Sequence, residues 1–179
     1  MNSEIVERLK KISITGRMAL GIRCLETNLQ DLGLLDYPEV QRMLSDFWEY
    51  TSSNNLVEWE EKILEYEPWF LFANVERTGF KGFKHLSNDE AKKIYDVIKR
   101  FERRLSEIIT EVIEIGISNL YSGVRKYSEC SLRATMNVME MLEAMKIPLP
   151  NLEIFEKSKF SEHHGWGIRR DRSFFSGID

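Results

Sequence analysis

The chain is poor in the residues from which metal and redox sites are built. Its 179 residues include three histidines and two cysteines, Cys24 and Cys130. The cysteines lie too far apart for the paired spacing of a zinc site, and we expect them to be reduced, buried residues rather than a disulfide. None of the histidines follows a glutamate by three residues, as the Glu-x-x-His pairs of di-iron bundles require. These motifs therefore predict no metal centre and no cofactor.

Motifs of phosphate binding and nucleophilic catalysis are missing as well. Gly16 and Gly21 have the spacing of a Walker A loop, but Ile22 occupies the place of its lysine, and no strand is predicted before them. The sequence contains no Gly-x-Ser-x-Gly and no His-Glu-x-x-His. On these absences we predict a protein that is not an enzyme.

Long hydrophobic runs are also lacking. The longest purely apolar run, Trp69–Ala73, is far shorter than the roughly 20 residues of a membrane span. No continuous apolar segment follows the charged N-terminus, so we expect a cytoplasmic protein without a membrane partner. The composition is 42% hydrophobic and 11% aromatic, which is enough to form a core, and we predict one domain over residues 1–179.

Residues 87–121 carry the clearest helical pattern. At 100° per residue, most of the apolar side chains of this segment fall within roughly 60° of Ile94. Ser87 and Glu90 fit a capping box at its start. A straight helix of this length would span about 50 Å, whereas a globule of this size is about 40 Å across. We therefore expect an elongated molecule, or a helix that bends or stops near Gly116, with the other segments packed around it.

The rest of the chain predicts an all-α fold, roughly a five-helix bundle. Four further helices are predicted over about residues 3–32, 38–51, 56–66 and 124–146. In the first of these the apolar side chains change sides near residues 13–16, which predicts a bend or a position between two layers.

Two segments lack a regular pattern. We expect residues 68–86 to form an ordered irregular connection pinned by aromatic side chains, with a short β-hairpin as the alternative. Residues 147–179 are too apolar for a free tail, and we expect an irregular C-terminal strap packed on the bundle, with a short helix near residues 152–157.

Charge is unevenly distributed although the net charge is only −4. Residues 36–67 contain nine acidic and two basic residues, whereas residues 76–104 contain nine basic and five acidic residues. Within residues 36–67, the two predicted helices over 38–51 and 56–66 are expected to form an antiparallel pair with acids on its outside (the acidic hairpin). The acidic hairpin also holds aromatic side chains, which often anchor interfaces, and its charge suits a partner with a basic surface. The predicted partner-binding residues are Trp48, Tyr50, Glu58, Glu61 and Glu65. Pairing of the acidic and basic segments within the molecule would weaken this hypothesis.

Nucleic acid or a phosphate ligand is an alternative partner, through the basic residues of the segment 81–104. On the predicted long helix these residues lie opposite the apolar stripe and are therefore exposed. A solvated helix face explains the same pattern.

A second alternative is a small-molecule enzyme or metal site in the strap. Its polar cluster comprises His163, His164, Trp166, Arg169 and Arg170. Histidines with flanking carboxylates can contribute to a metal site, and arginines can hold phosphate or carboxylate. The structural alternative is a tight glycine turn that lets Trp166 dock on the bundle.

In size, acidity, helical content and lack of catalytic groups, the chain is similar to the small immunity proteins of bacterial toxin systems, which bind and block a cognate toxin. The resemblance carries no residue over. It implies a toxin as the partner of a non-enzymatic, protein-binding domain.

Overall fold

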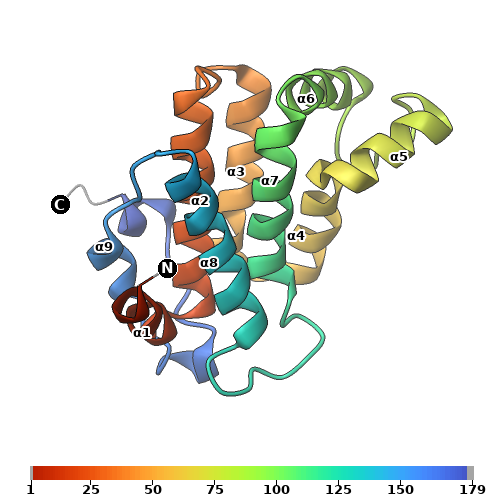
Figure 1. The fold of residues 1–179 in the computed structure, drawn as a ribbon. Helices are drawn as coiled ribbons and strands as arrows, with labels where there is room; N and C mark the ends of the chain where they lie inside the picture. Colours follow the sequence, from red (N-terminus) through yellow and green to blue (C-terminus); the bar gives the residue numbers. More distant parts are fainter. Residues whose placement is uncertain (1, 177–179) are drawn as a thin grey trace.

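The computed structural model describes residues 2–176, and the predicted all-α fold is confirmed (Figure 1). The regular elements in chain order are α1 (Ser3–Lys11), α2 (Ile14–Asp31), α3 (Pro38–Ser52), α4 (Leu56–Ile63), η1 (Leu64–Tyr66), α5 (Pro68–Thr78), α6 (Asn88–Arg100), α7 (Glu102–Ile117), α8 (Glu129–Ala144), α9 (Leu152–Glu156), η2 (His163–Gly165) and η3 (Arg172–Phe175). The only β-type pairing in the described part is an isolated bridge between Ile12 and Lys159.

The helix at the centre of the bundle is α2. Fourteen of its 18 residues are buried, and it packs against α3, α7 and α8 (Figure 1). This helix carries apolar residues on two sides because it lies between two layers of helices. A position between two layers is one of the two explanations that the sequence offered for the first predicted helix. The expectation that residues 87–121 form the central helix is wrong, because that segment packs on α2 from one side.

The predicted long helix is in fact two helices that meet at Phe101. The backbone of Phe101 leaves helical geometry (φ −117°, ψ 26°), and α6 then lies across the end of the bundle while α7 runs beside α8 (Figure 1). This bend allows α6 to pack on both α3 and α5. The capping box is confirmed, since Ser87 Oγ accepts from the Glu90 amide at 3.3 Å and Glu90 Oε2 accepts from the Ser87 amide at 2.8 Å.

The predicted first helix is likewise divided, at Ser13. Ser13 caps α2, because its Oγ accepts from the Gly16 amide at 3.0 Å, and its own amide donates to the Ser158 carbonyl of the strap. Two further hydrogen bonds join Thr15, through its amide and its hydroxyl, to the Trp166 carbonyl at 3.0 and 2.7 Å. The strap thus satisfies amides at the start of α2, which a helix end otherwise leaves unpaired.

Arg17 connects α2 to α1 and to the segment before α8. Its side chain is completely buried, and its guanidinium donates to the carbonyls of Leu9 and Tyr127 at 3.1 and 2.6 Å and to Ser131 Oγ at 2.9 Å. Burial lowers the pKa of Arg17 to about 10, so the group remains charged at neutral pH. Helix α8 begins at Glu129, directly after Ser128 in the left-handed region, and not near residue 124 as predicted.

Residues 68–78 form α5, and the predicted irregular connection is wrong over this range. Pro68 occupies the first helical position, where its missing N–H costs nothing, and the Glu67 carboxylate caps the helix by accepting from the Phe70 amide at 2.8 Å. Gly79, at φ +65°, ends it. The rings of Phe72 and Phe80 pack edge-on against Tyr95 of α6. These contacts fix α5, drawn in yellow, to the bundle (Figure 1).

Over residues 147–176 the C-terminal strap follows the prediction, and residues 177–179 of the predicted strap lie outside the described residues. Its short helix α9 lies where it was expected, and the strap packs on α1, α2 and α3. Phe175 of η3 is completely buried and stacks on both Trp48 and Phe155 at centroid distances of 6.3 and 6.2 Å.

Candidate partner-binding surface

The predicted aromatic anchors of the acidic hairpin are not accessible. Trp48 is 4% exposed and Tyr50 is 3% exposed, so their predicted position at an accessible edge is wrong. The strap covers Trp48, whose indole N–H donates to the buried Glu26 carboxylate at 2.8 Å. Tyr50 packs edge-on against Trp59 at 4.8 Å. The sequence could not show this burial, because the strap that covers Trp48 is more than 100 residues away in the chain.

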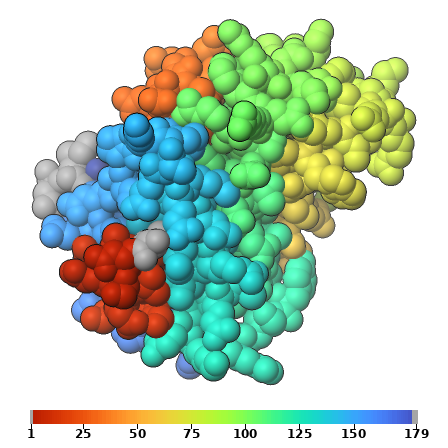
Figure 2. Space-filling model, in the orientation of Figure 1, coloured from red at the N-terminus to blue at the C-terminus, as the bar shows by residue number. Residues whose placement is uncertain are grey.

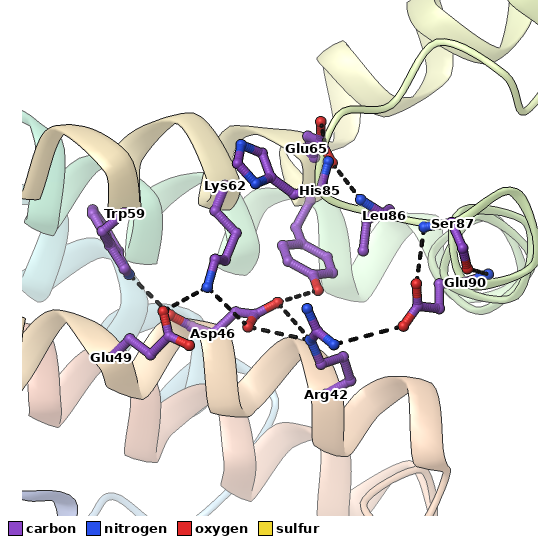
Figure 3. A network of polar contacts seen from close by, with 11 residues as sticks. Arg42, Asp46, Glu49, Trp59, Lys62, Glu65, His85, Leu86, Ser87 and Glu90 are labelled. Atoms are coloured by element: carbon purple, nitrogen blue, oxygen red, sulfur yellow. Dashed lines mark hydrogen bonds and ion pairs between the residues drawn. The ribbon is translucent and has the colours of Figure 1, made fainter.

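Glu65 is also internal, although it was predicted to face a partner. It is 5% exposed, and its carboxylate accepts hydrogen bonds from the backbone amides of Lys84, His85 and Leu86 at 2.5–3.1 Å. Figure 3 shows this carboxylate beside His85 and Leu86. The carboxylate holds the connection that leads into α6. Glu58 and Glu61 do lie on the surface, as predicted, and the Glu61 carboxylate binds the Lys84 ammonium.

A second buried carboxylate joins the hairpin to α6. Asp46 is 2% exposed and accepts from Arg42 Nε at 3.1 Å and from the Tyr66 hydroxyl at 2.6 Å, while Lys62 Nζ lies 3.7 Å away (Figure 3). Arg42 Nη1 also lies 3.7 Å from the Glu90 carboxylate of α6. Burial, together with the hydrogen bond to Asp46, raises the pKa of Tyr66, so its hydroxyl stays protonated as a donor. The two segments are therefore joined by Arg42 with Glu90 and by Glu61 with Lys84, while Arg42 and Lys62 neutralise Asp46 within the acidic segment itself.

The basic face of α6 and α7 is partly neutralised by its own acids. Lys93 binds Asp89 at 2.7 Å and Lys99 binds Glu102 at 2.9 Å, both between neighbouring turns. Arg104 reaches back to Asp31 of α2 at 2.9 Å. These contacts leave fewer free cations for a phosphate backbone than the sequence alone indicated.

The most accessible aromatic side chain of α5 lies in a groove that the sequence did not predict. Trp69 of α5 is 76% exposed, and with Phe72 it forms one wall of a groove of about 590 Å³ between α5, α7 and α8. Met141 of α8 lines the opposite side. Figure 2 shows α5 projecting from the body of the molecule next to the surface of α7 (green). This groove (the α5–α7 groove) is an apolar, concave surface on the outside of the protein.

Acidic side chains line the α5–α7 groove. Glu102, Glu107 and Glu111 of α7 and Glu67 before α5 contribute to its lining. Glu67 is occupied, since it caps α5 and accepts from the Thr110 hydroxyl at 2.9 Å, and Glu111 accepts from the Asn137 amide at 2.9 Å. The Glu107 carboxylate has no hydrogen bond or ion pair within residues 2–176. Glu107 is therefore an exposed negative charge beside an exposed indole.

The groove continues along α7 and α8. A second hollow of about 170 Å³ shares Glu107 and Met141 with it and is also lined by Ile108, Met145 and two basic residues, Arg103 and Arg104. Met141 and Met145 are half-buried rather than fully enclosed. Flexible thioether side chains adapt to the shape of a bound apolar group, so this floor suits a protein ligand.

The strap cluster is only partly brought together. His163, Trp166 and Arg169 line one cavity with Tyr50, whereas His164 and Arg170 do not line it. The Arg170 guanidinium instead lies 4.9 Å from the centroid of the Phe174 ring. Across residues 2–176, no group of three or more histidine, cysteine, aspartate or glutamate side chains is placed to hold a metal ion.

A local signal for the groove was present in the sequence. Pro68 and Gly79 stand at the positions that favour the start and the end of a helix, and a helix over this range buries Leu71 and Asn74 on one face. Trp69 lies off that face and is therefore predicted to be exposed once the helix is recognised. The partners of Trp69 on α7 and α8 follow only from the packing of the bundle.

Comparison of the chain with protein families, with curated proteins and with solved structures finds no match. None of the helices in the described range is both long enough and apolar enough to cross a membrane.

Proposed function

We propose that this protein acts by binding another protein, and that the α5–α7 groove receives a basic segment of that partner. The observation that carries the proposal is the 76% exposure of Trp69 beside acidic side chains. Tryptophan is among the residues that contribute most binding free energy at interfaces, and exposed charge around an anchor speeds the encounter with a partner of opposite sign.

The groove suits an amphipathic helix of the partner. Such helices place apolar side chains in a hydrophobic groove and leave charged residues at its rim. Here Phe72, Met141 and Met145 would contact the apolar face, and Glu107 would contact lysine or arginine. Of the partner-binding residues predicted from the sequence, only Glu58 and Glu61 are accessible, and Glu61 already binds Lys84.

The test is affinity capture from the native cell, followed by measurement of the dissociation constant for each protein that co-purifies. Trp69→Ala is expected to raise the dissociation constant for the true partner about 30-fold. This corresponds to a loss of about 2 kcal/mol of binding free energy, as is typical of an interface anchor. Glu107→Lys should slow association and reduce its dependence on salt.

Two variants serve as controls. Tyr121→Ala removes an aromatic side chain that is equally exposed, at 76%, but lies outside the groove. Glu58→Lys reverses a surface charge on α4, within the hairpin predicted from the sequence. If Glu58→Lys weakens the complex while Trp69→Ala and Glu107→Lys do not, the groove is the wrong surface.

Neutralisation of a bacterial toxin by direct binding is the specific form of this function that the size, acidity and helical content of the chain favour. Neighbouring genes that encode a toxin would supply the candidate partner. Protection of cells that produce this toxin by the wild-type chain, and loss of protection with Trp69→Ala, is the expected result.

A further inference from the structure

A cavity of about 370 Å³ lies between the strap, the start of α2 and the turn from α3 to α4. It is lined by Thr15, Tyr50, Ser53 and Leu56 from the bundle and by a strap segment that includes His163, Trp166 and Arg169. Its volume is at the lower end of the range of small-molecule sites. The cavity is separate from the α5–α7 groove, with which it shares no lining residue.

The strap side of the cavity is held in place by backbone contacts. The Trp166 carbonyl accepts both hydrogen bonds from Thr15, and the Arg170 amide donates to the Thr51 carbonyl at the end of α3 at 2.8 Å. Gly167 adopts φ +86°, and a Cβ atom there would lie 2.3 Å from Ser13 Oγ. Any other residue at this position would push the strap away from α2, so the wall of the cavity depends on this glycine.

The polar lining has one sign of charge. His163 and Arg169 can supply positive charge, the hydroxyls of Thr15, Tyr50 and Ser53 are neutral, and none of the lining residues carries a carboxylate. The Arg169 guanidinium donates to the Asn54 side-chain carbonyl through Nη1, which holds it at the mouth without neutralising it. Trp166, Leu56 and Ile168 supply apolar surface beside these groups.

Tyr50 lines the cavity, but its hydroxyl does not open into it. The hydroxyl is buried and has no hydrogen-bond partner among the residues that the structure describes. Burial raises the pKa of Tyr50, so the hydroxyl stays protonated. A buried donor without an acceptor lowers the stability of a protein, so this hydroxyl is a local cost of the packing beside the cavity.

We propose that this cavity binds a small organic oxyanion, a carboxylate or phosphate ester on a flat apolar body. Arg169 and His163 contact the oxyanion, and Trp166 contacts its apolar part. Arginine matches both kinds of oxyanion, because its guanidinium donates two parallel hydrogen bonds.

The test is titration of the full-length chain with phenyl phosphate and with benzoate, followed by calorimetry and by the indole signals in an NMR spectrum. At least one probe should bind and shift the Trp166 indole resonance, identified by its absence in Trp166→Phe. Which of the two binds more tightly distinguishes a phosphate site from a carboxylate site. Phenol, which is neutral at pH 7, should bind at least tenfold more weakly.

Variants locate the site. Arg169→Gln should raise the dissociation constant at least tenfold, whereas Arg125→Gln should leave it unchanged. Arg125 is a matched control, because it is an exposed arginine that lines a different cavity at the start of α8. Tyr50→Phe should raise the melting temperature of the free protein, because it removes a buried donor without an acceptor, and should leave the dissociation constant of the probe unchanged.

Three results would overturn the proposal. The first is the absence of binding by both probes at millimolar concentration. The second is equal binding of phenol, which would show that the oxyanion is not recognised. The third is loss of binding in Arg125→Gln but not in Arg169→Gln, which would place the site at the other cavity.

Discussion

Replacement of Glu65 by alanine should destabilise the fold rather than only weaken a complex. The carboxylate is buried and accepts hydrogen bonds from three consecutive backbone amides, those of Lys84, His85 and Leu86. In Glu65→Ala these amides lose their acceptor, and the connection between α5 and α6 loses its attachment to η1.

The magnitude follows from the burial of each amide. Leu86 is buried, so its N–H would stay unpaired, whereas water can reach the amides of Lys84 and His85. One unsatisfied buried donor costs about 1–3 kcal/mol, and hydrogen bonds to a charged acceptor contribute about 1.5–3 kcal/mol each. The cost of burying the carboxylate offsets part of this stabilisation. We expect a net loss of about 3 kcal/mol, which lowers the melting temperature of a domain of this size by about 6–12 °C.

Urea unfolding followed by circular dichroism measures the loss, and hydrogen exchange at the Leu86 amide tests its cause. The Leu86 amide should exchange slowly in the wild type and much faster in Glu65→Ala. Glu61→Gln is the control, because Glu61 is exposed and solvent screens its surface ion pair with Lys84. An unfolding midpoint for Glu65→Ala equal to that of the wild type would refute the structural role.

Two further predictions concern buried charge. Arg17→Met should lower the free energy of unfolding by about 3 kcal/mol, because the carbonyls of Leu9 and Tyr127 lose a buried donor. Urea unfolding measures this loss, and an unchanged midpoint would contradict the prediction. Burial, and then the charge of Glu111, raise the pKa of Glu114 above its ordinary value of 4.5. The folded state therefore favours protonated Glu114, and the stability that this group contributes falls as the pH rises from about 4.5 to the raised pKa. Between about pH 4 and pH 7 the melting temperature of Glu114→Gln should fall less than that of the wild type. Identical pH profiles of the two melting temperatures would disprove this assignment.

Local signals in the sequence predicted the elements better than their arrangement. The capping box at Ser87 and the short helix α9 were predicted correctly, because both depend on residues within one or two turns. The apolar stripe of residues 87–121 continued through Phe101, so helical periodicity alone could not reveal the bend. That bend depends on α3 and α5, against which α6 packs.

The candidate site was predicted less well, because accessibility depends on contacts between distant segments. Trp48 and Tyr50 flank the apolar face of their helix, which predicts a position at its edge, but the strap and α4 cover them. Glu65 reads as a surface acid until the amides of the segment 84–86 are placed against it. Trp69 was not among the predicted partner-binding residues, although it is 76% exposed.

The internal pairing of opposite charges changes which surface can attract a partner. Arg42 and Lys62 lie close to Asp46, and Glu61 already binds Lys84, so part of the negative charge of the hairpin is matched within the molecule. Glu107 lacks such a match within the described residues and stands beside the α5–α7 groove. An approaching basic segment gains more from an acid whose charge is not yet compensated than from one that must first release its own cation. The same pairing that weakens the case for the hairpin therefore directs the protein-binding hypothesis to α7 and to Trp69.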